Sequence, residues 1–360
     1  MAGKRHHFIP QFLQRGFASP DNPENAWVFP RGKSPYNTGI KNIALEGQFY
    51  SHEGDTSVDD AITDEEGALA VFVEGLRRAE DGAEVDALQA AKLIAHMLVR
   101  TRHVRENFQR LSGSLMDGVY RALSAPEKLV KVFTQHFEDD EDLIRVLRRF
   151  LTSTVAEHVS SERLEQLLDE ASTPGALREA RATLSKLFAE NAAESATALK
   201  SEGELAQSLL KDAMKSGHLK ALRRVGTGSA REEAFAKLRF RVRKYPGGHI
   251  ILGDSAALYA VEGERRVAPL NDATMPMTGV LLPLDSETCL IGELGEPCDV
   301  FATLESVRQA IAGCSLEFFI AAVDIPGNRA LAVSVGTSAH LLDSAGVKEV
   351  LDGLGLGEGT

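Results

Sequence analysis

The sequence has few cysteines and no long apolar segment. Its three cysteines, Cys289, Cys298 and Cys314, match neither a disulfide framework nor a zinc knuckle, and they indicate reduced thiols in a cytoplasmic protein. No segment approaches the roughly 20 consecutive apolar residues of a membrane span. The basic N-terminus also leads into none of the apolar stretch that a secretory signal requires. We therefore expect a cytoplasmic protein that does not associate with a membrane.

The motifs of several common enzyme classes are also absent from the sequence. It contains no Walker A loop, no Gly-x-Ser-x-Gly elbow, no His-Glu-x-x-His and no paired Cys-x-x-Cys. The alternating glycines of 353–359 superficially resemble a dinucleotide-binding loop, but they follow no good strand and open no helix. Standard nucleotide-binding, serine-hydrolase and zincin functions therefore have no support.

The composition is that of a globular protein. The chain has 360 residues, of which 43% are hydrophobic and 26% are charged, so it can bury a substantial core as one large domain or two ordinary ones. The net charge is −12, from 40 basic and 52 acidic residues. That sum argues against a surface coated with positive charge, but the charges are unevenly distributed.

Two segments are strongly basic. Residues 1–45 hold six Lys or Arg against two acids, a balance of +4, and residues 215–245 hold ten against two, a balance of +8. One interpretation is that these segments pair with acidic faces of the same molecule. The other is that they line a groove for a polyanion such as RNA or DNA. The candidate nucleic-acid-binding residues are Lys4, Arg5, Arg15, Arg239, Arg241 and Arg243.

Hydrophobic periodicity predicts an α+β fold with a short N-terminal β portion, a large helical middle and a C-terminal mixed sheet. The expected divisions are 1–57, 58–225, 226–352 and a flexible tail over 353–360, with the third portion packing back on the N-terminus. Residues 26–29 and 238–243 read as strands, the second with one basic face. We also expect a strand over 330–335.

The clearest predicted helix covers 84–111. One of its stripes is apolar, and the opposite stripe carries the polar residues Lys92, His96, Arg100, His103, Asn107 and Arg110. A much shorter helix is expected from Pro10, with Gly16 as its left-handed cap. Phe8, Phe12 and Phe17 should then face the core.

Two adjacent histidines, His6 and His7, precede this first helix. Backbone N–H donors concentrate at a helix N-terminus, so this pair can bind an anion or a metal, or transfer a proton. Because adjacent side chains diverge, we expect only one of the two to face a site. The alternative is that one histidine packs in the core and the other is solvated.

The chain resembles the bacterial family known as domain of unknown function 4238, whose members open with a His-His-x-x-Pro-x-x-x-Leu-x-x-Phe pattern. Here His6, His7, Pro10 and Phe17 carry that pattern. Further matches follow in order along the chain: Phe49-Tyr50, Glu65-Glu66, Arg100-Thr101, Gly253-Asp254-Ser255 and Leu282-Pro283-Leu284. Two departures matter, namely that neither Asp254 nor Arg100 is followed by proline. The resemblance implies a fold and no settled activity.

The matched positions together suggest a site formed by His6 or His7 with Glu66, Arg100 and Asp254. Metal-assisted phosphodiester hydrolysis requires this set, namely metal ligands or a base and a cation for the developing charge. The candidate catalytic residues are therefore His6, His7, Glu66, Arg100 and Asp254. His7, Glu66 and Asp254 are the candidate ligands of a divalent metal, Mg²⁺ or Mn²⁺. His96 and His103 share the stripe of Arg100 and can join the site.

Two functions remain open. The first is a metal-dependent nuclease or phosphoesterase, such as an effector in phage defence or a toxin-like protein. The second is a non-catalytic sensor or binding protein whose His, Glu, Arg and Asp residues form a buried structural network. Convergence of His6 or His7 with Glu66 and Asp254 favours the enzyme, and dispersal of these groups favours the binding protein. A protein partner or a homo-oligomer is compatible with either.

Overall fold

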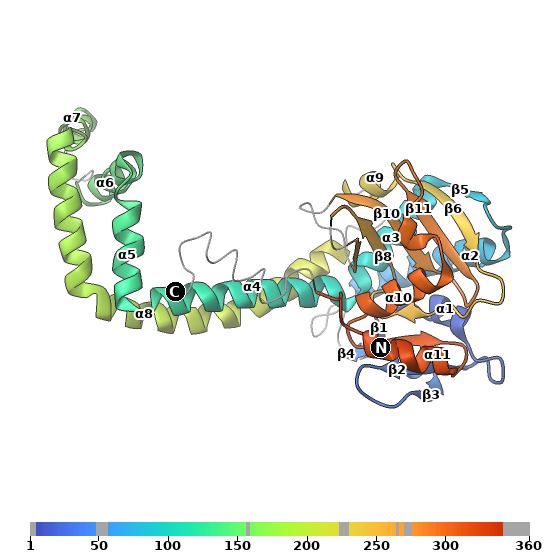
Figure 1. Ribbon diagram of the computed structural model, residues 1–360. Coiled ribbons are helices and arrows are strands. Elements are labelled where there is room, and N and C mark those ends of the chain that lie inside the picture. Colours follow the sequence, from blue (N-terminus) through green and yellow to red (C-terminus); the bar gives the residue numbers. More distant parts are fainter. Residues whose placement is uncertain are drawn as a thin grey trace. The chain divides into compact units, whose positions relative to one another are not determined.

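The computed structural model describes residues 5–47, 57–155, 159–222, 230–263, 266–269 and 276–340 (Figure 1). The chain forms two compact units, one from Met1–Gln109 with Asp212–Leu341 and one from Arg110–Lys211 with Leu342–Thr360. Lys4, the Phe49-Tyr50 pair and the tail over 353–360 lie outside the described residues. The fold is α+β, as the sequence predicts.

The first unit contains a six-stranded antiparallel sheet of order β5-β6-β11-β10-β8-β9. In that order the strands are Glu84–Val85, Arg239–Lys244, Thr288–Glu293, Met277–Pro283, Leu258–Val261 and Val267–Ala268. All residues of β11 and β8 are buried, so the middle of this sheet forms part of the core. The alternation predicted for 238–243 is present in β6, where Phe240 and Val242 are buried.

A four-stranded antiparallel sheet pairs strands from the N-terminal and C-terminal parts of the described chain. Its order is β3-β2-β12-β7, with bounds Tyr36–Gly39, Asn25–Pro30, Phe318–Ala321 and Leu252–Gly253. Ile320 of β12 pairs with Val28 of β2, and the rings of Phe29 and Phe319 stack with centroids 4.9 Å apart. The N-terminal segment is fixed by a separate pair, β1 (Arg5–His7) with β4 (Leu45–Gly47).

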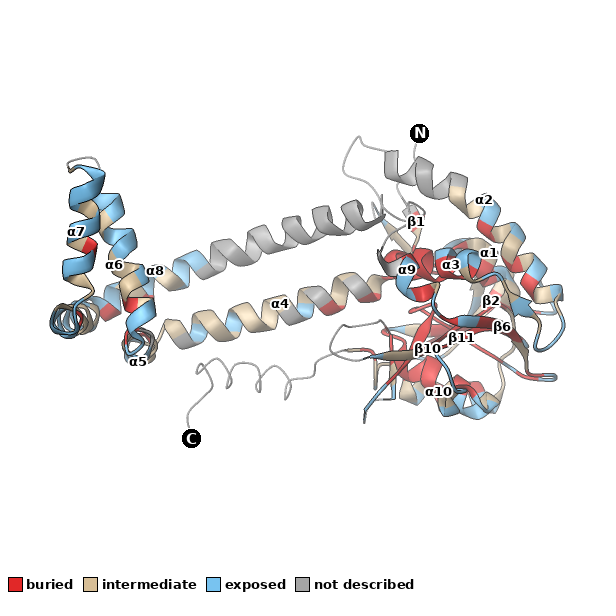
Figure 2. Ribbon diagram, turned by 90° about the horizontal axis from the view of Figure 1, so that it is seen from above, coloured by how far each residue is buried: buried red, intermediate tan, exposed pale blue. Residues whose placement is uncertain are grey.

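The helices of the first unit cover these sheets. They are α1 (Gln11–Gln14), α2 (Ser57–Arg78), α3 (Ala87–Arg100), α9 (Ala230–Phe235), α10 (Leu304–Cys314) and α11 (Pro326–Leu331). The described residues of the unit also form short 3-10 helices, namely η1 (Arg15–Phe17), η2 (Ile40–Asn42), η3 (Asp299–Phe301) and η4 (Ala332–Ser334). Helix α3 packs against α9 and β6, while α10 contacts β8 and β9 of one sheet and β7 and β12 of the other. Figure 2 shows buried residues concentrated on α3 and the central strands.

Thr101 separates α3 from α4, although the sequence predicts one helix over 84–111. Its backbone is extended, with φ −71° and ψ 154°, and its hydroxyl donates to the Leu98 carbonyl at 3.1 Å. The hydroxyl thereby satisfies a carbonyl at the end of α3. The polar stripe expected on this helix is largely buried, since His96, Arg100, His103 and Asn107 are all at most 7% exposed. A buried polar stripe needs specific partners.

Two local expectations are wrong. The region 330–335 is not a strand: α11 begins at Pro326, a residue with a φ suited to the first helical turn, and η4 follows it. Gly16 is not a left-handed cap, because it is absent from the positive-φ glycines of the described chain. Its role is close packing, since a Cβ there would lie 2.1 Å from the Leu284 carbonyl oxygen and 2.5 Å from the Arg77 guanidinium. Phe8 and Phe17 are buried and Phe12 is partly buried.

The described part of the second unit is helical. Its helices are α4 (Arg102–Leu123), α5 (Pro126–His136), α6 (Asp140–Val155), α7 (Ser161–Ala171) and α8 (Pro174–Leu222). The first residues of α4 and the last residues of α8 belong to the first unit. Phe137, Leu143 and Leu177 form a small buried cluster, and exposed residues predominate on α6 and α7 (Figure 2). Within the described part of the chain, no helix is long and apolar enough to cross a membrane.

Arg181 of α8 closes the turn between α5 and α6. Its Nε donates to the Phe137 carbonyl at 2.6 Å, and its Nη2 lies 2.5 Å from Asp140 Oδ1. We expect Arg181→Ala to lower the free energy of unfolding of this unit by about 1–3 kcal/mol, because a partly buried carbonyl loses its donor. Thermal unfolding followed by circular dichroism measures this change. Arg178→Ala is the matched control, since Arg178 is exposed and donates within its own helix. Equal stability of both variants would contradict the prediction.

Candidate functional site

Arg100, the last residue of α3, is the centre of the predicted site. The residue is 2% exposed, so its permanent charge is almost completely removed from water. Its Nη1 donates to the Glu66 carboxylate from α2, and its Nη2 donates to the backbone carbonyl of His7 at 2.7 Å. Arg100 therefore connects α2, α3 and β1 through one guanidinium.

His96 extends this network by one helical turn. Its Nδ1 lies 3.3 Å from Glu65 Oε2, and its Nε2 lies 3.2 Å from Arg100 Nη1. Burial lowers the pKa of His96, and the hydrogen bond from His96 lowers the pKa of Glu65. A neutral His96 with its proton on Nδ1 satisfies both contacts: it donates to the Glu65 carboxylate and accepts from Arg100.

His7 contributes to the network through its backbone. Its Nδ1 lies 2.9 Å from the Ile43 carbonyl, so it must donate there, and its Nε2 accepts from Gln11 Nε2 at 2.9 Å. Both ring nitrogens thus have protein partners. The next residue, Phe8, packs against Phe318 with ring centroids 6.4 Å apart. These contacts hold the start of the chain against the fold.

The side chains of His6 and His7 lie on opposite faces of β1, because neighbouring residues of a strand alternate. His6 is 5% exposed and pairs in the β1–β4 ladder with Glu46. The Glu46 carboxylate forms ion pairs with Arg105 at 2.6 Å and Arg102 at 3.3 Å, both from the first turn of α4. Adjacent histidines therefore face different surroundings, as the divergence of neighbouring side chains predicts.

Asp254 belongs to a different cluster. It is 3% exposed, and its carboxylate accepts from the backbone N–H groups of Leu316 and Glu317, each at 2.7 Å, and of Phe318 at 3.2 Å. The Nε2 atom of His103 lies 3.8 Å from Asp254 Oδ1 and donates to the Cys314 carbonyl at 2.8 Å. Asp254 thus fixes the turn that leads from α10 into β12.

The structure therefore divides the predicted constellation in two. Glu66, Arg100 and the His7 backbone lie together, whereas Asp254 lies with His103 and the turn before β12. Among the residues that the structure describes, no group of three or more His, Cys, Asp or Glu side chains is arranged to hold a metal ion. The predicted set of His7, Glu66 and Asp254 is accordingly not assembled as a ligand group in the described chain.

Sequence reasoning missed several members of these clusters. Glu65 binds His96, and Glu46 binds Arg102 and Arg105. Arg77 of α2 donates to the carbonyls of Leu284 at 2.7 Å and Phe12 at 2.9 Å, which attaches α1 to the end of β10. The adjacent Glu65-Glu66 pair was a usable signal for a carboxylate site. Nothing in the local sequence indicates the partners of Arg77 or Glu46.

The basic face of β6 is partly neutralised. Arg241 Nη2 forms an ion pair with Glu293 Oε2 at 2.7 Å, and Glu293 is only 5% exposed. Arg243 lies 3.8 Å from Asp81 and stacks over the Tyr245 ring. Arg239 is exposed, as is Arg15, which donates to Gln11 at 3.4 Å. Arg5 begins β1. Two of the three predicted β6 arginines therefore face acids of the same chain.

Comparison with protein families identifies one match. A family model described as a protein of unknown function (DUF4238) matches residues 5–222, more than half of the chain. The chain belongs to this family. The DUF4238 match contains every residue of the Arg100 network and ends before β6 and Asp254. Neither the curated proteins nor the solved structures contain a significant match.

The Asp254–His103 pair predicts opposing effects of pH on stability. Burial raises the pKa of Asp254 from 3.8 to about 7, although the three backbone N–H donors act in the opposite direction. Between these two pH values the folded protein binds a proton that the unfolded chain does not, so the free energy of unfolding falls as pH rises. Burial lowers the pKa of His103 from 6.5 to about 3, so folding releases a proton there and stability rises with pH. In the wild type the two contributions offset each other.

Single substitutions should separate these contributions. In His103→Gln the Asp254 contribution remains, and we expect the free energy of unfolding to fall as pH rises from about 4 to 7. In Asp254→Asn the His103 contribution remains, and we expect the free energy of unfolding to rise as pH rises from about 3 to 6.5. In each variant the slope should be at most about 1.4 kcal/mol per pH unit. Urea unfolding across pH measures both slopes. Slopes of the same sign in both variants would refute the assignment.

The β6 arginines also make a separable prediction. Arg241→Gln should lower the free energy of unfolding by roughly 1–3 kcal/mol, because the buried Glu293 loses its ion-pair partner and keeps only the Cys298 N–H, whereas Arg239→Gln should leave stability unchanged. If β6 binds RNA or DNA, Arg239→Gln should weaken that binding and reduce the slope of log affinity against log salt by about one. Fluorescence anisotropy at several salt concentrations tests this. Unchanged affinity in Arg239→Gln would mean that the β6 arginines only pair with acids of the same chain and do not bind nucleic acid.

Proposed function

We propose that this protein is a non-catalytic sensor or binding protein, in which the cluster of histidine, glutamate and arginine residues fastens the N-terminal segment. The observation that carries the proposal is the state of Arg100, which is 2% exposed and directs its donors to Glu66, His96 and the His7 carbonyl. A guanidinium that stabilises developing charge on a substrate must present donors to that substrate. Here those donors serve the fold.

The surroundings of the other candidate groups support the same proposal. Both ring nitrogens of His7 are occupied by protein partners, and the Asp254 carboxylate accepts three backbone N–H groups. Groups in such positions contribute to the stability of local structure. A catalytic base or a metal ligand would need an accessible lone pair.

A metal-dependent nuclease or phosphoesterase remains the second candidate, and one observation favours it. The side chains of Glu65 and Glu66 remain 27% and 30% exposed, so two carboxylates next to Arg100 can be reached from solvent. Carboxylate oxygens are the ligands that Mg²⁺ and Mn²⁺ prefer. Roles in phage defence or as a toxin-like effector belong to this second proposal, as does cleavage of RNA or DNA.

Stability and activity measured on the same variants distinguish the two functions. We expect Glu66→Gln to lower the free energy of unfolding by roughly 1–3 kcal/mol, because Arg100 then stays buried beside a neutral amide. Asp254→Asn should cost a similar amount, because an amide N–H faces backbone donors. Glu190→Gln is the matched control, since Glu190 of α8 is exposed and lies 3.9 Å from the exposed Lys186. Thermal melts measure these changes.

The same preparations are assayed for cleavage of mixed RNA and DNA with and without Mg²⁺ or Mn²⁺. The binding proposal expects destabilisation of both cluster variants and no metal-dependent cleavage by the wild type. Metal-dependent cleavage that Glu66→Gln abolishes without loss of melting temperature would overturn it in favour of the enzyme.

A further inference from the structure

A cavity of about 410 Å³ lies in the first unit beside α10. Its polar lining comes from the β8–β9 turn, η3, α10 and the segment after η4: Arg266, Asp299, Ser306, Gln309, Thr337 and Ser338. The volume falls in the range of small-molecule sites. None of these residues belongs to the Arg100 network or to the predicted constellation.

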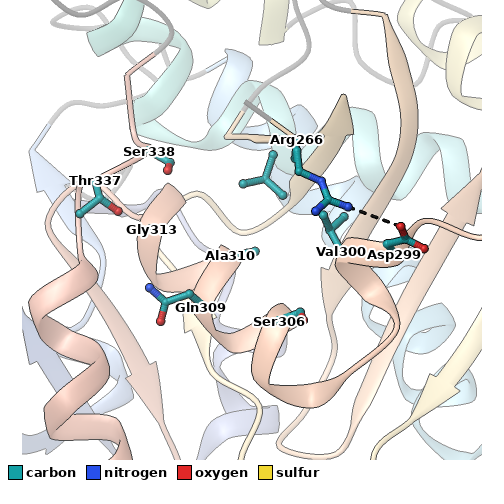
Figure 3. A pocket seen from close by; sticks show the side chains of 10 residues that line it. Arg266, Asp299, Val300, Ser306, Gln309, Ala310, Gly313, Thr337 and Ser338 are labelled. Atoms are coloured by element: carbon teal, nitrogen blue, oxygen red, sulfur yellow. Dashed lines mark ion pairs between the residues drawn. The ribbon is translucent and has the colours of Figure 1, made fainter. Parts of the chain in front are cut away.

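The polar groups of the cavity are distributed unequally (Figure 3). Arg266 and Asp299 lie together on one side, where Arg266 Nη2 is 3.5 Å from Asp299 Oδ2. Thr337 and Ser338 lie on the opposite side, and Gln309 projects from α10. Gln309 Nε2 donates to the Ser334 hydroxyl at 2.8 Å, which leaves the amide oxygen as an acceptor. One side of the cavity is therefore charged and the other is neutral and hydrogen-bonding.

Gly313 helps to keep the neutral side open. It lines the cavity, and a Cβ at this position would lie 3.2 Å from the Thr337 hydroxyl oxygen and 3.5 Å from that of Ser338. The apolar lining is small as well, since it comes from Val267, Val300 and Ala310. No aromatic ring belongs to the described lining, so the cavity offers no surface for stacking a base or a sugar ring.

The backbone at Arg266 is locally unfavourable. Its φ is +58°, in the left-handed region that glycine and asparagine adopt readily and a long side chain does not. This residue closes the β8–β9 turn, where its carbonyl accepts from the Val261 N–H at 3.0 Å. Glycine would adopt this backbone conformation with less strain, so the arginine side chain does not stabilise the turn itself. Strained residues of this kind concentrate at binding sites.

The opposite charges of Arg266 and Asp299 determine which charged groups a ligand of the cavity can carry. Both side chains are mostly exposed, at 61% and 88%, so the pair contributes little to stability and can exchange partners. A simple anion would gain from Arg266 and be repelled by Asp299. A ligand that carries one negative and one positive group gains from both residues.

We propose that this cavity binds a small zwitterion of the free amino-acid class. The ligand carboxylate pairs with the Arg266 guanidinium, its ammonium pairs with Asp299, and a polar side chain extends toward Gln309 and Thr337. This inference rests on the proposed binding function, for which it names the ligand class. The nuclease assay and the ligand assay use different residues and different readouts, so the two proposals fail separately.

Isothermal titration calorimetry of the full chain with each of the common amino acids tests the proposal. Inorganic phosphate is the comparison anion, and each binding amino acid is also compared with its decarboxylated amine and its deaminated acid. We expect at least one polar amino acid to bind, with both analogues about tenfold or more weaker, because each lacks one charge-assisted contact. Binding of no amino acid, or binding of phosphate and the deaminated acid at full strength, overturns the proposal.

Replacing Arg266 with glycine removes the side chain without straining the turn, because glycine tolerates the positive φ at this position. Arg266→Gly should reduce amino-acid affinity about tenfold or more while the melting temperature stays the same or rises, because glycine relieves the left-handed strain. Ala44→Gly is the matched control: Ala44 also has a positive φ, +54°, and lies outside the cavity lining, so it should keep full affinity. Unchanged affinity in Arg266→Gly overturns the proposal.

Discussion

The burial of one permanent charge organises the first unit. Arginine cannot lose its proton in a protein, so a guanidinium that is 2% exposed must be paired on every side that faces protein. Arg100 meets this demand with a carboxylate from α2, an imidazole from its own helix and a carbonyl from β1. Three elements that are distant in sequence are thereby fixed together.

A second polar cluster holds the same N-terminal segment from another side. The Asp254 carboxylate orders the turn before β12, which ends at Glu317, and the first residue of the strand, Phe318. Glu317 forms an ion pair with Arg102 at 2.7 Å, while Phe318 packs against Phe8 and Arg102 lies over the Phe8 ring. The residues Arg100 and Arg102, on either side of Thr101, thus reach different clusters. A continuous helix would place their side chains about 200° apart, and the extended backbone of Thr101 changes that relation.

These clusters explain why residues typical of catalysis occur in a chain that we propose to be a binding protein. Histidine, glutamate and arginine are also the residues from which buried hydrogen-bonded networks are built. What separates the two uses is whether the donors and acceptors are directed at other protein groups or at an open volume. In the Arg100 network they are directed at protein. In the cavity beside α10, the charged pair is mostly exposed, and the amide oxygen of Gln309 is left as an acceptor after its Nε2 donates to Ser334.

The sequence by itself determined the α+β class, the strand with a buried and a basic face at β6, and the packing of Phe8 and Phe17. It also determined the resemblance to the DUF4238 family, which the family match confirms. These features follow from periodicity, propensity and a linear motif, all of which are local. The candidate residues His7, Glu66 and Arg100 were also recognisable, because their types and order are written in the chain.

Only the tertiary structure decided what those residues contact. Asp254 and Glu66 are separated because each carboxylate binds the donors nearest to it in space, and those donors come from turns and helices that sequence spacing does not relate. The helix break at Thr101 is likewise visible only in the tertiary structure, where Arg100 and Arg102 reach partners on different elements, Glu66 of α2 and Glu317 before β12. The periodicity over 84–111 favours one helix, because a local pattern does not record which distant partners its polar residues must reach.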